Sequence, residues 1–355
     1  MRYVLLVLLV AIAGFAALLA FGPSRIEPLA WTPPANPGLT GPYAPNEALK
    51  GATLATVAPG RGPEDVALGP DGFLYTGLED GSIVRLRADG STPPERVAQT
   101  GGRPLGLEFA ADGALIVADG RRGLLSVAPD GTVSVLAVKA DGKPIAFADD
   151  LAIASDGTVY FSDASTRGLD HLALDAWEGR ATGRLLAYDS TTGETRVVLG
   201  ELRFANGVAL AADESFVLVN ETFAYRVTRV WLKGPKAGTH DVFIDALPGF
   251  PDNISADAAG RFWIALVQPR DDQADAMAGR PLLRRMLFNL FALIGFPEQG
   301  SPYGWAIGVD AEGRVFANLQ DPSGRVTSVT SVNLFGDTLV LGSLTMDAIA
   351  TIPAP

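Results

Sequence analysis

Acidic and amide side chains stand directly before several apolar segments of this chain, and oxygen-rich side chains of this kind bind hard cations. They are Glu64-Asp65 in GPEDVAL, Asp149-Asp150 in FADDLAI, Asn206 in FANGVAL and Asp252-Asn253 in FPDNISA. A charged or amide group at the start of a buried strand costs free energy unless it has a partner. We therefore predict that these groups share calcium, although each of them alone could be an ordinary turn residue or strand cap.

Composition excludes several other kinds of site. The chain has no cysteine, which rules out disulfides, thiolate zinc sites and cysteine nucleophiles. Its two histidines, His171 and His240, cannot supply a three-histidine metal site. The net charge is −12 and lysines and arginines do not cluster, so we expect no nucleic-acid partner.

The acidic and amide positions are in phase with a repeat of two apolar strands joined by a tight turn. Six copies have their turns at Gly72, Gly113, Gly157, Glu214, Gly260 and Gly313. A period of roughly 40–50 residues with short strands is typical of a β-propeller. We predict an all-β, six-bladed propeller over residues 46–355, in which strand 337–344 completes a blade begun elsewhere. A β-sandwich is the alternative, but it would not repeat so regularly.

The N-terminus predicts a membrane helix, because residues 3–22 form an uncharged apolar run long enough to cross a bilayer. We interpret residues 1–22 as an uncleaved signal anchor and residues 23–45 as a proline-rich spacer. A cleaved signal is the alternative, although Pro23 disfavours cleavage. Arg2 before the run places the propeller outside the cytoplasm, on the periplasmic or extracellular side.

Residues 281–296, PLLRRMLFNLFALIGF, interrupt the repeat and predict a helical insertion. Two interpretations remain open for this helix. It could pack across a face of the propeller, or it could lie in the membrane interface with its apolar side chains in lipid. Arg284 and Arg285 within so short a segment argue against a second membrane span.

Residues 204–254 resemble the conserved region of strictosidine synthases, in particular that of the adipocyte plasma-membrane-associated protein family. The blocks GRPLGLEF, FADDLAI, GRLLAYD and LLRRMLF extend this resemblance over most of residues 60–345. Such proteins group with the paraoxonases and gluconolactonases, so the resemblance implies a six-bladed propeller with calcium in its central channel. The calcium ligands it implies are Glu64, Asp149, Asn206, Asp252 and Asn253.

The chain departs from these families at several positions. Asp149 replaces the usual asparagine, and its extra negative charge should tighten calcium binding. The resemblance to paraoxonases also allows a second ion near Asp65 and Asp150. Their histidine dyad is absent, because Leu105 and Asp119 stand near those places. The catalytic glutamate of strictosidine synthase is missing from residues 327–337, so we do not expect the condensation that gives the family its name.

These observations predict a calcium-dependent hydrolase of small lactones or esters. Calcium would polarise the substrate carbonyl, and a carboxylate would activate water. The candidates for this base are Asp252, Asp149 and Asp119, in that order; His171 is a fourth if its insert, residues 165–179, reaches over the channel, and otherwise it is a surface residue. The alternative is a non-catalytic, calcium-stabilised propeller that binds a small ligand, a lipid or a protein.

Overall fold

The computed structural model describes residues 2–296 and 302–355, which form two compact units. The larger one, called the propeller unit, comprises Pro34–Asp170, Ala181–Arg270 and Ser301–Pro355. The smaller one, called the helical unit, comprises Met1–Pro33, His171–Arg180 and Asp271–Gly300.

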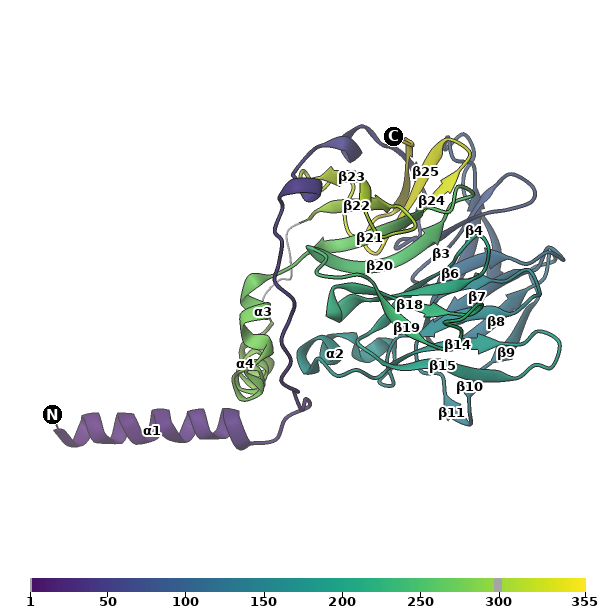
Figure 1. Ribbon diagram of the computed structural model, residues 1–355. Coiled ribbons are helices and arrows are strands. Elements are labelled where there is room, and N and C mark those ends of the chain that lie inside the picture. Colours follow the sequence, from purple (N-terminus) through teal and green to yellow (C-terminus); the bar gives the residue numbers. More distant parts are fainter. Residues whose placement is uncertain (1, 297–301) are drawn as a thin grey trace. The chain divides into compact units, whose positions relative to one another are not determined.

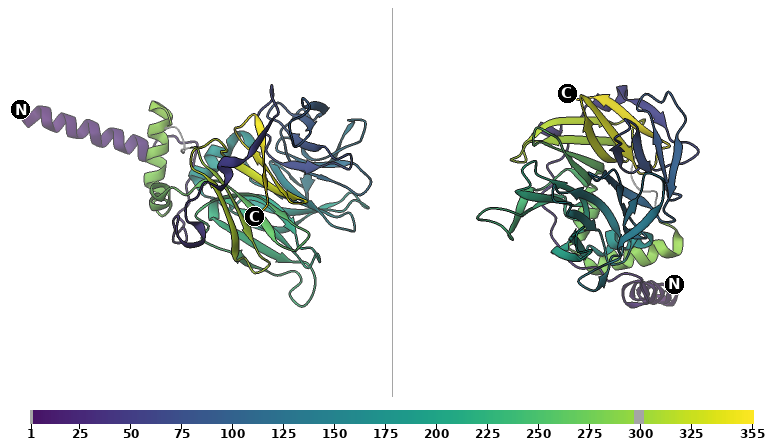
Figure 2. Two further views of the ribbon diagram at one scale, coloured as in Figure 1. Left: turned by 90° about the horizontal axis from the view of Figure 1, so that it is seen from above. Right: turned by 90° about the vertical axis from the view of Figure 1, so that its right-hand side faces the viewer.

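The propeller unit contains six four-stranded antiparallel sheets among the described residues, and they follow one another around a common centre (Figure 1; Figure 2). The predicted six-bladed propeller is therefore confirmed. Blades 1 and 2 consist of β2 (Val66–Leu68), β3 (Leu74–Gly77), β4 (Ser82–Leu86) and β5 (Glu95–Gln99), then β6 (Pro104–Phe109), β7 (Leu115–Asp119), β8 (Gly123–Val127) and β9 (Val133–Ala137). Blades 3 and 4 consist of β12 (Ala148–Ile153), β13 (Val159–Asp163), β14 (Gly183–Tyr188) and β15 (Thr195–Leu202), then β16 (Ala205–Leu210), β17 (Phe216–Glu221), β18 (Arg226–Trp231) and β19 (His240–Ile244).

The last two blades show how the ring closes. Blade 5 consists of β20 (Gly249–Ala256), β21 (Phe262–Pro269), β22 (Gly304–Val309) and β23 (Val315–Asp321). Blade 6 consists of β24 (Val329–Phe335), β25 (Thr338–Ser343), β26 (Ala348–Pro353) and, as its outermost strand, β1 (Thr53–Thr56). The first strand of the propeller thus pairs with the last, in the register Thr53 to Thr351.

One repeat copy has a different place from the predicted one. The copy whose turn holds Gly313 is β22–β23, the outer hairpin of blade 5, and not the inner hairpin of blade 6. The inner strand of blade 6 is β24, which enters β25 through Gly336-Asp337. Residues 337–344, expected to complete a blade, supply its second strand. The reversed order of glycine and aspartate in this turn concealed the sixth inner hairpin.

Apolar side chains fill the space between neighbouring blades. Each of the six blade junctions has its own cluster of buried residues. At the junction of blades 1 and 2, for example, Ile83 and Leu107 belong to one cluster with Val117 and Leu125. Because alternate residues of a strand point to opposite faces of its sheet, a blade buries both faces and its inner strands are nearly continuous in apolar residues.

Short elements connect the strands of the propeller unit. They are η1 (Gly41–Tyr43), η2 (Ala48–Gly51), η4 (Thr222–Ala224) and the small hairpin of β10 (Lys139–Ala140) and β11 (Lys143–Pro144). η1 and η2 lie against β23, where Asn46 Nδ2 donates to the carbonyl oxygen of Asn318. The chain therefore packs against blade 5 before it enters β1.

The helical unit contains α1 (Arg2–Phe21), α2 (Leu172–Glu178), α3 (Asp272–Ala278) and α4 (Pro281–Ile294). η3 (Leu169–His171) precedes α2. Within residues 2–296 and 302–355, α1 alone is long and apolar enough to cross a membrane, with a mean hydropathy of 3.0 over its most apolar window. The predicted N-terminal helix and helical insertion are both present, as α1 and α4.

Candidate metal centre

Each inner strand presents one dipeptide to the channel, and in five blades a bulge in the strand pairing occurs at this dipeptide. Bulges re-aim side chains that a regular strand would send to opposite faces. In blade 1 the dipeptide directly precedes β2. The six dipeptides are Glu64-Asp65, Leu105-Gly106, Asp149-Asp150, Asn206-Gly207, Asp252-Asn253 and Thr330-Ser331.

The structure brings the predicted calcium ligands together. Asn253 Nδ2 lies 3.3 Å from Glu64 Oε2, although the two residues are far apart in sequence. The side chain of Asn206 is hydrogen-bonded to Asp252. The charge of Asp149 interacts with those of Glu64 and Asp252. All five side chains are buried, with no more than 7% of any residue exposed.

The three carboxyl groups of this cluster have raised pKa values. Burial raises the pKa of Glu64 well above its usual range, and repulsion by Asp252 and Asp65 adds to the effect. Burial followed by repulsion from Glu64 and Asp252 does the same for Asp149. Burial raises the pKa of Asp252 to about 7. Three mutually repelling carboxylates in a dry channel are what a bound divalent cation would stabilise.

Two amide oxygens point to the same conclusion. Asn206 Oδ1 and Asn253 Oδ1 are buried, and neither accepts a hydrogen bond from any described residue. A buried acceptor without a partner costs about 1–3 kcal/mol. Across residues 2–296 and 302–355, no three carboxylate or imidazole side chains are grouped so that they could hold a metal by themselves. A metal ion at this place would therefore need the amides among its ligands, and a mixture of carboxylate and amide oxygens suits calcium.

Neighbouring strands hold the ligand backbone in place. Thr330 Oγ1 donates to the carbonyl oxygen of Glu64 at 2.6 Å, and Asn220 Nδ2 donates to that of Asp252 at 2.6 Å. The carbonyl oxygens are thereby satisfied, and the side chains remain directed at the channel. Partners of this kind orient metal ligands in many proteins.

Asp65 and Asp150, the residues predicted for a second ion, connect adjacent blades. Asp65 Oδ2 accepts the N–H of Leu107 at 3.0 Å, and Asn333 Nδ2 donates to Asp65 Oδ1 at 3.0 Å. Asp150 accepts the N–H groups of Leu151 and Val208. Every oxygen of these two carboxylates thus already accepts a hydrogen bond, and a second ion remains a prediction.

The structure also places Asp119 and His171, the two remaining residues predicted to act in proton transfer. Asp119, at the end of β7, is fully buried, and its Oδ1 accepts the N–H groups of Arg103, Arg121 and Arg122. Asp119 Oδ2 has no hydrogen-bond partner in the part of the chain that the structure describes. His171 belongs to the helical unit, where it is exposed at the start of α2. Their catalytic roles remain predictions.

Arg103 is a component of this site that the sequence motifs did not assign. Its residue is 4% exposed, and its Nη2 donates to the carbonyl oxygen of Gly62 at 2.9 Å. Its charge interacts with Glu64 and Asp149, and its Nη1 has no hydrogen-bond partner among the described residues. The repeat does contain a signal for this arginine. Arg103 stands two residues before the channel dipeptide of blade 2, and the equivalent position is phenylalanine in blades 3 to 5.

Those phenylalanines form one side of the site. Phe147, Phe204 and Phe250 stand two residues before Asp149, Asn206 and Asp252. Phe147 and Phe204 have ring centroids 5.5 Å apart, and Phe223 lies 4.7 Å from Phe204 and 6.4 Å from Phe250. We call these four residues the aromatic wall. These rings thus form one cluster that joins blades 3 to 5.

The inner strands also enclose a cavity of about 420 Å³. Asp65, Asp150 and Asn253 line it, and so do Leu210 and Phe335 from the ends of their strands. Glu108 lines the same cavity and accepts the N–H of Ile153 at 3.0 Å. Burial raises the pKa of Glu108 to about 7.

Comparisons with known proteins agree with this architecture. The strictosidine synthase family matches residues 149–235, and its strictosidine synthase-like N-terminal region matches residues 41–86. The adipocyte plasma membrane-associated protein of Rattus norvegicus is 33% identical over 97% of this chain and 96% of its own length.

Two solved structures share the fold. A gluconolactonase from Xanthomonas campestris superposes with a TM-score of 0.64 at 17% identity, over 94% of this chain and 99% of its own. The calcium-binding protein regucalcin from Agrobacterium tumefaciens superposes with a TM-score of 0.58 at 15% identity, over 84% of this chain and 90% of its own. Given the near full-length match to the rat protein, the chain belongs to the strictosidine synthase-like family of β-propellers, together with the adipocyte plasma membrane-associated proteins.

Proposed function

We propose that the protein is a calcium-dependent hydrolase of small lactones or esters. The observation that carries the proposal is the pair of unsatisfied oxygens, Asn206 Oδ1 and Asn253 Oδ1, beside three buried carboxyl groups. The structural similarity to a gluconolactonase and to a calcium-binding regucalcin supports the fold's suitability for this chemistry. The substrate class follows from the resemblance to paraoxonases and gluconolactonases and from the ability of a calcium site to polarise a carbonyl group.

Glu64, Asp149, Asn206, Asp252 and Asn253 would hold the ion. When bound, calcium would polarise a carbonyl group and stabilise the oxyanion that forms on it. The three carboxylates would neutralise the ion's charge, and the two amide oxygens would gain the partner that they lack among the described residues. Arg103 would add a fixed positive charge on one side of the site.

The chain's own residues divide the remaining work. Asp252, which is hydrogen-bonded to Asn206 beside the ion, would accept the proton of the attacking water. That proton would then pass to the leaving oxygen as the carbon–oxygen bond breaks. Asp149, Asp119 and His171 remain the other candidates for this proton transfer. The aromatic wall would pack against the apolar part of the substrate, and Arg103 Nη1 would face a developing negative charge.

A combined melting and turnover experiment tests this proposal. The full-length protein in detergent, stripped with a chelator, would be melted with calcium and with magnesium, and each sample assayed on lactones and aryl esters. We expect a rise in melting temperature specific to calcium, with turnover that Asp252→Ala abolishes without unfolding the protein. No thermal shift, together with metal analysis that finds no retained ion, would contradict the proposal that calcium binds in the channel.

A binding protein is the second candidate, and the placement of the histidines favours it. His240 is an exposed residue of β19, and His171 lies in the helical unit, so neither histidine comes from a channel-lining strand. A calcium-specific shift without turnover of any lactone or ester would support this alternative, in which the channel binds a small ligand, a lipid or a protein.

We also propose that α1 anchors the protein in a membrane and that the propeller unit lies outside the cytoplasm. The apolar composition of α1 and the name of the rat relative support the anchor. The side of the membrane rests on Arg2 alone. Protease protection of the propeller in spheroplasts would contradict this orientation.

A further inference from the structure

We propose that α4 lies on the surface of the bilayer, with its apolar side against the acyl chains, at the end where α1 leaves the membrane. The proposal rests on α1 as the membrane-spanning helix and does not depend on hydrolase chemistry. It is carried by the different surroundings of the three sides of α4 within the helical unit.

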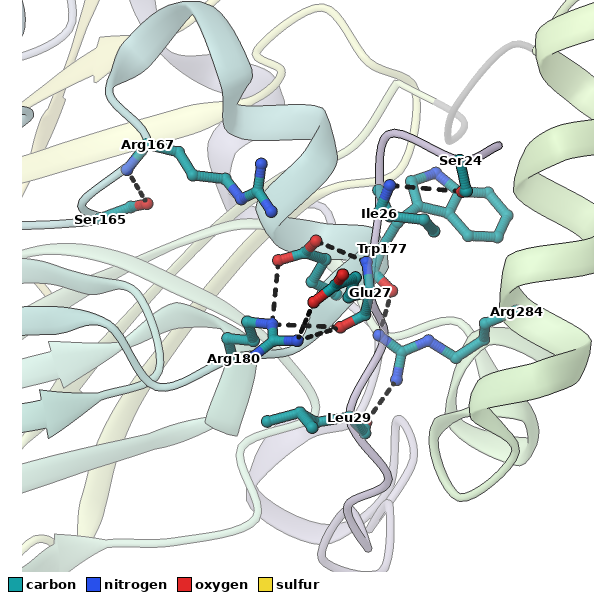
Figure 3. A network of polar contacts seen from close by, with 10 residues as sticks. Ser24, Ile26, Glu27, Leu29, Ser165, Arg167, Trp177, Arg180 and Arg284 are labelled. Atoms are coloured by element: carbon teal, nitrogen blue, oxygen red, sulfur yellow. Dashed lines mark hydrogen bonds and ion pairs between the residues drawn. The ribbon is translucent and has the colours of Figure 1, made fainter. Parts of the chain in front are cut away.

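The first side of α4 packs inside the helical unit. Arg284 donates to the carbonyl oxygen of Leu29 at 3.2 Å and also to that of Trp177 (Figure 3). It donates to the carbonyl oxygen of Ala278 at 3.3 Å as well. Phe288 is 3% exposed and is packed with Ile26 and Leu174. This side fixes the rotation of α4 about its own axis.

Hydrogen bonds also connect α2 with the segment that follows α1. Glu27 N donates to Glu178 Oε1 at 2.7 Å, and Arg180 Nη2 donates to the carbonyl oxygen of Glu27 at 2.7 Å (Figure 3). Leu29 N donates to the carbonyl oxygen of Glu178 at 3.0 Å. The segment after α1 is therefore held at defined points against α2 and α4.

The second side of α4 binds the end of α1. Arg285 Nη2 donates to the carbonyl oxygen of Gly22 at 2.7 Å, and Asn289 Nδ2 donates to that of Leu19 at 2.8 Å. The last carbonyl groups of a helix have no partner within the helix, so these two side chains satisfy groups at the very end of α1. Figures 1 and 2 agree that α4 runs across this end of α1.

The third side of α4 is apolar throughout. At 100° per residue it contains Leu282, Leu283, Met286, Leu287, Leu290, Leu293 and Ile294. Leu293 and Ile294 are 66% and 69% exposed, and Leu282 is 48% exposed. An exposed helix side normally carries charged or polar residues, and this one carries none.

The contacts with α1 decide what covers this side. If α1 spans the bilayer, the carbonyl groups at its end lie at the lipid–water interface. Arg285 and Asn289 reach those carbonyl groups directly, so α4 must lie at the same depth. Trp177 lies beside α4, with its ring centroid 6.0 Å from that of Phe291. Tryptophan side chains favour the lipid–water interface. The helix has no acidic residue, so anionic headgroups would not repel it.

The absence of native cysteine makes a direct test simple. Leu282→Cys and Leu293→Cys would be made in the full-length protein and labelled with an environment-sensitive fluorophore. The protein would be reconstituted into phosphatidylcholine–phosphatidylglycerol vesicles with and without a lipid whose nitroxide lies near the headgroup, and in a separate set with a lipid whose nitroxide lies deep in the acyl chains. Leu9→Cys, in the middle of α1, is the positive control for the deep nitroxide. Val242→Cys is the matched negative control, because this apolar residue of the propeller unit is 46% exposed.

We expect a blue-shifted emission that the headgroup nitroxide quenches at positions 282 and 293, and neither effect at position 242. Quenching at position 9 by the deep nitroxide, without quenching at 282 and 293 by the headgroup nitroxide, would overturn the surface placement of α4. Absence of quenching at position 9 as well would overturn the spanning role of α1 together with it. Shielding at 282 and 293 that depends on protein concentration and not on the nitroxide would mean that a second copy covers α4, which also contradicts the proposal.

Discussion

The carboxylate of Asp150 in blade 3 accepts the backbone N–H of Val208 in blade 4 at 2.8 Å. Asp65 in blade 1 accepts the N–H of Leu107 in blade 2 in the same way. In both cases the acceptor follows a predicted calcium ligand in sequence, and the donor follows a glycine. Adjacent inner strands are thus joined at the level of the candidate metal centre, and each of these glycines allows its own strand to approach the following blade closely.

Gly207 illustrates how little room this arrangement leaves. A Cβ atom there would lie 2.5 Å from the carbonyl oxygen of Asp252 and 2.5 Å from the nitrogen of Ile254. We expect Gly207→Ala to lower the free energy of unfolding by about 2 kcal/mol or more, because backbone must move. Urea denaturation measures this effect. Gly200→Ala is the matched control, since nothing lies within 4 Å of a Cβ atom there; equal stability of the two variants would contradict the close packing.

Asp149→Asn tests the charge of the calcium site. The variant keeps a side-chain oxygen at the ligand position but removes one of three carboxylates, so we expect calcium to bind about tenfold more weakly. Isothermal titration calorimetry on the chelated protein measures this. Asp156→Asn, an exposed turn residue between the first two strands of the same blade, should leave the affinity unchanged. Unaltered binding by Asp149→Asn would remove this residue from the ligand set.

Arg103→Gln should change calcium affinity and ester turnover in opposite directions. Arg103 interacts with Glu64 and Asp149, so its removal takes a positive charge away from the cation site. We expect calcium to bind more tightly, by on the order of tenfold, and ester turnover to fall because Nη1 no longer faces the developing charge. Arg121→Gln, whose partner is the exposed Asp170, serves as the control. Weaker calcium binding by Arg103→Gln would show that the arginine has a structural role instead.

Glu108 should make stability depend on pH. Its pKa is raised to about 7 by burial, so the folded protein binds a proton that the unfolded chain releases at lower pH. Stability from this group is therefore present below the unfolded pKa and is lost as pH rises through about 7. With calcium in excess, we expect the wild type to lose roughly 2 kcal/mol more than Glu108→Gln between pH 5 and pH 8. Parallel pH profiles in urea denaturation would rule this out.

The turn residues and the regular spacing of the repeat copies predict much of this fold. The Asp-Gly turns identified inner hairpins because a residue with positive φ is needed there, as at Gly157, where φ is 86°. Local chemistry could not separate inner from outer hairpins, since β22–β23 has the same kind of turn as the inner pairs. Blade position is decided by which strands pair across the whole chain. For that reason the hairpin around Gly313 was placed in the wrong blade.

The grouping of the predicted calcium ligands is predictable for a different reason. Charged and amide groups precede strands that must be buried at Glu64, Asp149, Asn206 and Asp252-Asn253. Arg103 is harder to assign, because its place two residues before Leu105 does not by itself give the arginine a role. Its role depends on its burial beside Glu64 and Asp149, which only the closed ring creates. The bulges that aim the dipeptides are likewise tertiary features.

The pairing of β1 with β26 also determines the order in which this protein can be completed during synthesis. β1 precedes the other strands of the propeller in the sequence, and its partner strand β26 follows them. If α1 is inserted first, the nascent propeller is tethered to the bilayer while its ring is still open and its sheet edges are unpaired. The synthesis of β26 is therefore the step that allows a row of blades to become a closed ring.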